Sequence, residues 1–434
     1  MSPGRLARTL ERRASPFSAC GRGLPLALAV GALLSASAAR ADRGLAKLTA
    51  SDAIRLALSR NPDSRATDED VAAAGGALIQ SKLLSNPSIF IYTLGAGISP
   101  AEAPIPNQFG VTWTIPFGGK RAAGIAIARA GVKAAESTRV AARRQLALSV
   151  ETRFVSVLLD QSILAFAEED QAAFRQSVTL NELRYKDGKI AWVELLKLRI
   201  QERAVDDTVR QAAQALFNDR AELSRLVGVG TLDPNYAVVG ELAPPPENGD
   251  FSAERVIDQA LEDRADYRAL AAQRDSAEAA VRLARRIPIP DVGVLADYNR
   301  TPGSAGSYDI SLTAAVPIFD HNQGNLKTAI ASFEKAKLAL DSLRAQIRAD
   351  AVRAVEEWRI SRERLSSYSG ALVQAAREAL DINRRSYQEG RGSLLDYLSA
   401  ESDNRDVQRA YRSAQAEAML AAANLKFVSG EDLP

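Results

Sequence analysis

The stretch Tyr185-Lys186-Asp187-Gly188 returns as Tyr387-Gln388-Glu389-Gly390, 202 positions later (387 minus 185) in a chain of 434 residues. An acidic residue stands six positions after the glycine in both copies, Glu194 in the first and Asp396 in the second. A repeat with such a long period indicates a duplicated half-domain and not a stack of short solenoid units.

Two further landmarks recur at nearly the same offset, so the repeat covers most of the chain. Ile115-Pro116-Phe117 returns as Val316-Pro317-Ile318, and Asp63 returns as Asp266. From this we predict the following parts: a signal peptide over 1–41, a first structural repeat over 42–228, a linker over 229–252, a second repeat over 253–428 and a tail over 429–434.

The first 41 residues are typical of a cleaved secretory signal peptide. Arginines precede the apolar run Leu24–Leu34, and Ala39-Arg40-Ala41 fits a cleavage site with small residues. The run is too short for a membrane-spanning helix, which needs about 20 apolar residues. The only cysteine, Cys20, would leave with this segment, as would six Arg and one Glu, which changes the net charge from +2 to about −3. We therefore expect export and no basic surface for nucleic acid.

Each repeat contains a predicted β-hairpin, over 88–116 in the first and 291–318 in the second. Their apolar residues alternate with polar ones, which is the period-two pattern of strands. Strands of about nine to eleven residues have the length of a tilted transmembrane β-strand. In a membrane, four aromatic residues would lie at the water boundary: Tyr92, Trp113, Tyr298 and Tyr308. The same pattern also fits a soluble sheet of two hairpins.

Each predicted hairpin is followed by a long segment without proline, 119–186 in the first repeat and 322–389 in the second. Apolar residues recur every three or four positions there, the spacing of coiled-coil helices. We predict one unbroken helix of roughly 100 Å in each segment. Shorter helices complete the repeats, two leading ones over 52–84 and 254–286 and two returning ones over 193–228 and 393–428.

The chain resembles the TolC-like outer-membrane efflux channels over about 48–428. The resemblance rests on the twofold repeat, the order of hairpin and long helix, and the Tyr-x-x-Gly turn with its acid. Phe117-Gly118-Gly119-Lys120-Arg121 and Phe319-Asp320-His321-Asn322-Gln323-Gly324-Asn325 look most like the CzcC-type subgroup, which serves heavy-metal cation efflux. It implies a mainly α-helical homotrimer whose subunits each give four strands to one twelve-stranded β-barrel and their helices to a periplasmic tunnel.

The resemblance also implies partners and a location. The partners are a periplasmic adaptor protein, an inner-membrane RND-type pump that supplies the energy, and outer-membrane lipid. The protein would lie in the outer membrane with a large periplasmic part.

The turns of the two helical hairpins are the first candidate site. Gly188 and Gly390 permit the chain to reverse, and the simplest interpretation is that they do nothing more. The resemblance adds docking of the adaptor, because exposed turns of long hairpins have little else to contact. The candidate docking residues are Gly188, Lys189, Ile190, Ala191, Gly390, Arg391, Gly392 and Ser393.

A periplasmic constriction is the second candidate site. The resemblance aligns Asp396 with an acid that family members place there, and three copies would form a ring that attracts cations. The simpler interpretation is an acid in the first turn of a helix, favoured by the helix dipole. Ser399 stands where some members carry a second acid, so a looser closed state is expected. Tyr387 and Glu194 are the remaining candidates, and Glu194 is expected to contact neighbouring elements or the adaptor.

The sequence predicts no enzyme, no cofactor and no resident metal. His321 is the only histidine, and Met419 would be the only methionine left after removal of 1–41, so a selective soft-metal site is not expected. Gly118-Gly119-Lys120 lacks the glycine spacing of a phosphate-binding loop. The Arg/Glu pairs along the long helices are expected to form solvated faces with weak pair energies.

The leading hypothesis is a passive, trimeric exit duct of a tripartite efflux system that carries heavy-metal cations. One alternative is a drug or type I secretion duct of the same family. Another is a periplasmic coiled-coil scaffold without a pore, which would stay soluble without detergent.

Overall fold

The computed structural model describes residues 47–93, 106–228, 236–244, 251–300, 305–368 and 370–431. The chain divides into two units, Met1–Ala46 and Lys47–Pro434, and all described elements belong to the second unit. The predicted signal peptide over 1–41 and most of the predicted linker lie outside the described residues.

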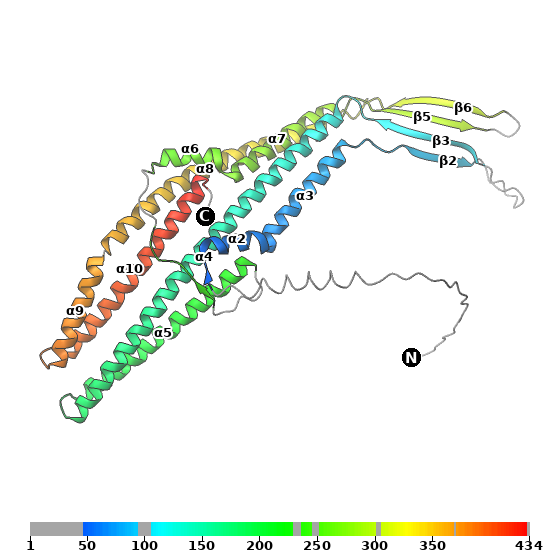
Figure 1. Ribbon diagram of the computed structural model, residues 1–434. Coiled ribbons are helices and arrows are strands. Elements are labelled where there is room, and N and C mark those ends of the chain that lie inside the picture. Colours follow the sequence, from blue (N-terminus) through cyan, green and yellow to red (C-terminus); the bar gives the residue numbers. More distant parts are fainter. Residues whose placement is uncertain are drawn as a thin grey trace, which may run out of the picture. The chain divides into compact units, whose positions relative to one another are not determined.

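Two similar runs of helices and strands follow one another along the chain (Figure 1). The first run consists of α2 (Ala50–Arg60), α3 (Pro62–Lys82), β2 (Ser88–Thr93), β3 (Pro106–Ile115), α4 (Lys120–Lys186) and α5 (Trp192–Val227). The second consists of α6 (Ala253–Asp263), α7 (Ala265–Arg286), β5 (Val292–Asn299), β6 (Ser307–Ala314), α8 (Gln323–Ser367), α9 (Gly370–Gln388) and α10 (Leu394–Ser429). Two short strands, β1 (Lys47–Leu48) and β4 (Ala237–Val238), pair in parallel, so the predicted linker pairs with the start of the first run.

The helix α4 is the axis on which the two runs pack. It has 67 residues, which corresponds to roughly 100 Å of helix. It contacts α3 and α5 of its own run and α7 and α10 of the other run. Figure 1 shows the strands beyond one end of this helical part and the two hairpin turns at the other end.

Small residues line the buried face between α4 and α7. Ala123, Ala130 and Ala134 are buried on α4, and Ala272 and Ala279 are buried on α7. Side chains of this size let helix axes approach closely, because ridges and grooves are shallow. The alanine-rich composition therefore produces a close-packed helical wall and not a thick core.

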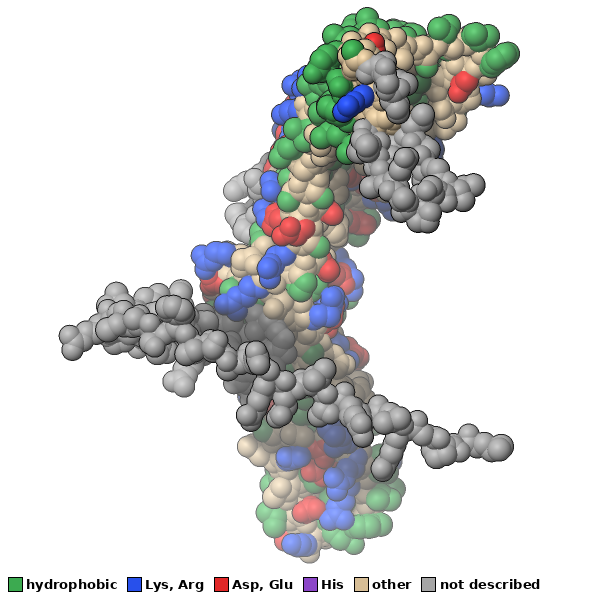
Figure 2. Space-filling view, turned by 90° about the vertical axis from the view of Figure 1, so that its right-hand side faces the viewer, with side chains coloured by type: hydrophobic (Ala, Val, Ile, Leu, Met, Phe, Trp, Pro, Cys, Tyr) green, Lys and Arg blue, Asp and Glu red, His purple; other side chains and the backbone are tan. Residues whose placement is uncertain are grey.

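The four longer strands form one antiparallel sheet in the order β2-β3-β5-β6. The register pairs Ile89 with Val111, Val111 with Ala296, and Ala296 with Ile310. Directly paired residues share a face, so one face of the sheet is apolar across all four strands. Figure 2 shows hydrophobic side chains gathered over this end of the molecule, whereas basic and acidic ones are interspersed along the helices.

The opposite face of the sheet is mainly polar. It carries Gln108, Thr112, Asp297 and Asp309, and the Gln108 amide donates to the Asp297 carboxylate at 2.7 Å. Tyr308 and Ile310, which belong to the apolar face, are 85% and 81% exposed. The sheet thus has an exposed apolar face, a polar face and two unpaired edge strands, β2 and β6.

The prediction of one unbroken helix over 322–389 was wrong. The segment is divided into α8, which ends at Ser367, and α9, which begins at Gly370. The hydroxyl groups of Ser366 and Ser367 donate to the Glu363 carbonyl oxygen, so these side chains compete with the helical backbone bonds. Serine and glycine are also poor helix formers compared with alanine or leucine.

Both leading helices that were predicted as single are also divided. Asn61 separates α2 from α3, and its side-chain oxygen accepts from the backbone N–H groups of Asp63 and Ser64. Pro62 then occupies the first helical position, where its missing N–H costs nothing. Arg264 separates α6 from α7 with an extended backbone, φ −64° and ψ 121°.

Among the described residues, no helix combines the length and the apolar composition that crossing a lipid bilayer requires.

Candidate functional site at the hairpin turns and the seam between the hairpins

The first hairpin turn joins α4 to α5 and is closed by its own backbone. Gly188 has φ 71°, a left-handed conformation that glycine adopts without strain. The backbone N–H of Gly188 donates to the Tyr185 oxygen at 2.9 Å, and that of Lys189 donates to the Arg184 oxygen at 2.8 Å. Lys189 and Ala191 are exposed and Ile190 is half-buried. The turn therefore offers a firm backbone with accessible side chains.

The second turn, between α9 and α10, repeats this geometry. Gly390 has φ 73°, and its N–H donates to the Tyr387 oxygen at 3.1 Å. The N–H groups of Arg391 and Gly392 both donate to the Ser386 oxygen, at 2.8 and 2.9 Å. The guanidinium of Arg391 pairs with Glu389 and is exposed. Both predicted docking turns are thus exposed hairpin ends of matching backbone shape.

Tyr387 lies beside the second turn but is buried. Its hydroxyl donates to the Asn181 side-chain oxygen at 3.1 Å, and its ring stacks on Tyr397 with centroids 5.7 Å apart and planes at 6°. The Arg184 guanidinium lies over the same ring, 5.1 Å from its centroid. Burial raises the pKa of Tyr387, the nearby Glu194 carboxylate adds to the rise, and Arg184 opposes it. Two of the predicted constriction residues, Tyr387 and Glu194, are thus close enough to influence each other electrostatically.

These contacts belong to a line of buried and half-buried polar groups between the two hairpins, which we call the seam. On α4 it comprises Ser162, Asp170, Ser177, Asn181 and Arg184, and on α9 and α10 it comprises Tyr387, Tyr397, Glu401, Arg405 and Arg412. Apolar residues such as Phe174, Leu380 and Leu394 pack beside it. The seam joins the first repeat to the second near the turns.

Glu401 is the most deeply buried acid of the seam, at 1% exposure. It faces Asp170, whose Oδ2 lies 3.4 Å from the Arg405 guanidinium. Burial raises the pKa of Glu401 to about 7, the Asp170 carboxyl adds to the rise, and Arg384 and Arg405 oppose it. The expectation of solvated charged pairs along the long helices therefore does not describe this group.

The other two constriction candidates lie on the surface of α10. Asp396 is exposed; its backbone N–H donates to the Ser393 hydroxyl at 3.1 Å, and that hydroxyl donates to the Asp396 carboxylate at 2.8 Å. Ser393 is thus the N-cap of α10, and Asp396 is bound to it. Ser399 is exposed as well. Within one subunit the structure does not bring Asp396 and Ser399 together with Tyr387 and Glu194.

Three of the four predicted membrane-boundary aromatics share the apolar face of the sheet. Tyr298 pairs directly with Tyr308, and their ring centroids lie 5.1 Å apart. Trp113 lies on the same face near the helices, and its indole N–H donates to the Ser85 oxygen at 2.8 Å. Tyr92 pairs with Gln108 and therefore lies on the polar face.

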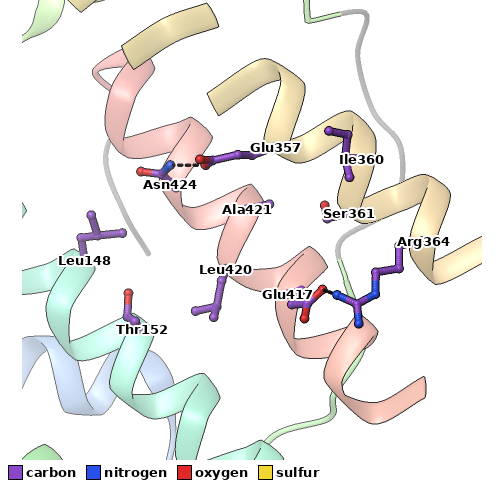
Figure 3. Close-up of a pocket in the computed structure, with 10 residues that line it drawn as sticks. All are labelled: Leu148, Thr152, Glu357, Ile360, Ser361, Arg364, Glu417, Leu420, Ala421 and Asn424. Atoms are coloured by element: carbon purple, nitrogen blue, oxygen red, sulfur yellow. Dashed lines mark hydrogen bonds and ion pairs between the residues drawn. The ribbon is translucent and has the colours of Figure 1, made fainter. Parts of the chain in front are cut away.

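A pocket of about 470 Å³ lies between α4, α8 and α10 (Figure 3). Two polar contacts join α8 to α10 in its wall: Arg364 to Glu417 at 2.6 Å, and the Asn424 amide to the Glu357 carboxylate at 3.1 Å. Leu420 extends from α10 toward α4 in the same view. The described residues hold no group of three or more His, Cys, Asp or Glu arranged to bind a metal ion.

Comparison with known proteins matches each half of the chain separately. The sequence profile of the family described as "Outer membrane efflux protein" matches residues 53–229 and again 256–431. The chain belongs to this outer membrane efflux protein family. The two matches coincide with the two runs of elements, so the duplication seen in the sequence is that of the family unit.

Curated relatives of this efflux-family chain are metal-resistance proteins of Cupriavidus metallidurans. It is 25% identical to the cobalt-zinc-cadmium resistance protein CzcC over 94% of this chain and 99% of that protein. It is 28% identical to the nickel and cobalt resistance protein CnrC over 68% of this chain and 69% of that protein. The outer membrane protein VceC of Vibrio cholerae has the same fold, with a TM-score of 0.71 and 20% identity over 88% of this chain and 96% of that one. The fold is therefore the TolC-like one.

Sequence reasoning missed most of the seam. Tyr397 and Glu401 of the seam are buried on α10, and so are Asn404 and Gln408 beside them. Their spacing of four, three and four places them on one helical face, and this face is polar where a buried helix would ordinarily be apolar. That polar stripe was the available signal.

Proposed function

We propose that this chain is the outer-membrane exit duct of a tripartite efflux system and that it works as a passive homotrimer. A periplasmic adaptor and an inner-membrane RND-type pump would deliver its cargo. Export would use the signal peptide predicted over 1–41. The duct would provide passage and no catalysis, in agreement with its membership of an efflux family.

The observation that carries this proposal is the two-faced sheet. Its apolar face is exposed over all four strands, and its other face bears Gln108, Asp297 and Asp309. An apolar exterior with a polar interior suits strands that separate lipid from water. The edge strands β2 and β6 leave backbone groups unpaired, which is costly in lipid. Copies of the same chain can pair those edges, and three copies would contribute twelve strands.

We further propose that the hairpin turns receive the adaptor. Both turns are exposed, both are closed by backbone hydrogen bonds, and both present a basic side chain, Lys189 or Arg391. Asp396, bound to its own helix cap, lies on the exposed side of α10 and is available to face a central axis in a trimer. A ring of three such acids would favour cations.

Heavy-metal cations are the cargo that we propose, supported by the names of the curated relatives. The chain has one histidine, one cysteine and two methionines in total, too few for a selective soft-metal site of its own. Selection among metals would therefore belong to the pump or the adaptor, and the duct would conduct what they deliver.

Two experiments test this proposal: deletion of the gene tests the cargo, and membrane fractionation tests the location. We expect the deletion strain to become sensitive to cobalt, zinc, cadmium or nickel, and expression of the intact chain to restore tolerance. The protein should sediment with outer membranes and require detergent for extraction. If the deletion strain keeps its metal tolerance but becomes sensitive to organic compounds, the cargo is organic and not metal. If the protein is soluble in water without detergent, the duct proposal is wrong.

A further inference from the structure

Asp170 and Glu401 face each other in the seam, and both belong to the buried interior. The Asp170 side chain is 8% exposed and Glu401 is 1% exposed. Asp170 comes from α4 of the first repeat and Glu401 from α10 of the second. A contact between them therefore joins the two hairpins.

Only one arginine is paired with these two carboxyl groups. The Arg405 guanidinium lies 3.4 Å from an Asp170 oxygen, which compensates one carboxylate. One Glu401 oxygen, Oε2, is buried and has no hydrogen-bond donor. An ionised carboxylate buried without a donor is costly, and two carboxylates this close repel each other. A single proton on Glu401 removes both costs, because the protonated carboxyl can donate to Asp170.

We propose that Asp170 and Glu401 form a proton-binding site that latches the second hairpin of a subunit onto the first. With the proton bound, the Glu401 O–H donates to the Asp170 carboxylate, and Arg405 holds that carboxylate from the other side. When the proton leaves for solvent, two buried negative charges face each other across the seam. The contact between α4 and α10 is then weakened, and separation of the hairpins becomes easier.

The charged and titratable surroundings favour a neutral Glu401. Asp170 faces it from α4, Arg384 from α9, and Tyr397 and Arg405 from α10. Both arginines are paired with other acids: Arg405 with Asp170, and Arg384 with Asp381 at 3.7 Å. The resulting pKa of about 7 is consistent with a proton that leaves near neutral pH. One proton per subunit changes the equilibrium between latched and separated hairpins by at most about tenfold per pH unit.

The hairpin turns provide the positions for a direct test. Lys186 and Gln388 occupy equivalent places in the two turns and are exposed. The only natural cysteine, Cys20, lies in the predicted signal peptide. A chain with Lys186→Cys and Gln388→Cys can therefore carry two spin labels, one on each hairpin. The labelled chain, from which residues 1–41 have been removed, would be co-assembled with excess unlabelled chain, so that the measured distance lies within one subunit.

We expect the distance distribution to become longer or broader as pH rises from about 5 to about 8, with a midpoint near the pKa of Glu401. Glu401→Gln retains an uncharged group that can donate to Asp170, so its distribution should stay narrow at every pH. Asp170→Asn should move the midpoint to lower pH by at least about one unit, because the repelling charge is gone.

The control is Asp403→Asn, which removes an exposed acid two residues away on the same helix and should behave as the wild type. A wild-type distribution that does not change with pH would overturn the latch, as would a Glu401→Gln chain that responds as the wild type does. If Glu401→Gln fails to assemble, the midpoint of Asp170→Asn decides by itself. No transport is measured, so a failed latch leaves the duct proposal standing, and a failed metal assay leaves the latch standing.

Discussion

In the first hairpin α4 continues without interruption from Lys120 to Lys186, whereas the second hairpin is divided between α8 and α9 at the equivalent level. The repeat offset places Gly370 opposite Glu168 of α4. The first copy reads Leu-Ala-Phe-Ala-Glu at 164–168, and the second reads Ser-Ser-Tyr-Ser-Gly at 366–370. Residues with high helix propensity thus stand opposite residues that favour a break. The two copies therefore differ here in a short stretch of composition, and one has a continuous helix where the other has two.

The two turns also differ in the burial of their equivalent tyrosines. Tyr185 of the first turn is exposed and contacts Trp192, which is half exposed. Its counterpart Tyr387 is buried between Arg184 and Tyr397. The second hairpin is therefore jointed in its stem and fastened at its end by the seam. This difference agrees with the proposal that the second hairpin separates from the first when Glu401 loses its proton.

The largest expected difference between the hairpins concerns their aromatic contacts. Tyr397→Ala removes a fully buried ring, its stack on Tyr387 and its hydroxyl bond to Ser177. A substitution of this kind costs about 3–5 kcal/mol. Tyr185→Ala removes a partly exposed ring and should cost less than about 1 kcal/mol. Denaturant unfolding of the two variants measures both values, and equal losses would mean that the seam does not distinguish the hairpins.

The pH dependence of stability should also differ between the first hairpin and the seam. In the first hairpin, burial raises the pKa of Asp160 from 3.8 to about 6, with Asp219 adding to the rise. In the seam, burial raises that of Glu401 from 4.5 to about 7. Both carboxyl groups thus bind a proton more tightly in the folded protein than in the unfolded chain. Their stabilising contribution is therefore complete below the unfolded pKa and is lost as pH rises through the folded one.

Asp160→Asn should accordingly flatten the fall of melting temperature up to about pH 6, and Glu401→Gln should flatten it up to about pH 7. Melting temperatures of the purified assembly, followed from about pH 4 to about pH 8, provide the comparison. Melting curves of both variants that parallel the wild type would show that these acids titrate normally.

A smaller effect is expected from exchanging helix-forming and helix-breaking residues at the matched level. Gly370→Ala places a methyl group where no other atom lies within 4 Å, and should stabilise the second hairpin by about 0.5–1 kcal/mol. Glu168→Gly at the exposed counterpart in α4 should destabilise the first hairpin by about as much. Hydrogen exchange along both stems would locate each change. If Gly370→Ala leaves exchange across the joint unaltered, the break is maintained by packing and not by propensity.

An effect of similar size is expected at the caps that follow the turns. Ser393 caps α10 with its side chain, whereas Ala191 occupies the same position before α5 and has no side-chain cap. Ser393→Ala should lower the free energy of unfolding by about 1 kcal/mol, and Ala191→Ser should raise it by a similar or smaller amount. The essential result is that the two substitutions change the free energy of unfolding in opposite directions. If both lower it, the two turns differ in backbone shape.

Much of the helical part was predictable because helices are encoded locally. The predicted 119–186 and 193–228 compare with Lys120–Lys186 and Trp192–Val227 in the structure. The breaks at Asn61 and at 367–370 were missed although their signals, Asn-Pro and the serine run, are local too. Pro62 follows Asn61 directly, and a proline at this place marks a helix start. At 367–370 no proline is present, but side-chain competition and low helix propensity also end helices.

The duplication, most of the elements and the turn glycines follow from local sequence, because periodicity and backbone conformation depend on neighbours along the chain. The contact of Tyr387 with Asn181 and the approach of Glu401 to Asp170 arise from helix packing, since these partners are more than 200 residues apart. The ionisation of Glu401 depends on what burial excludes and on which charges remain beside it, and both are properties of packed helices and not of their sequences.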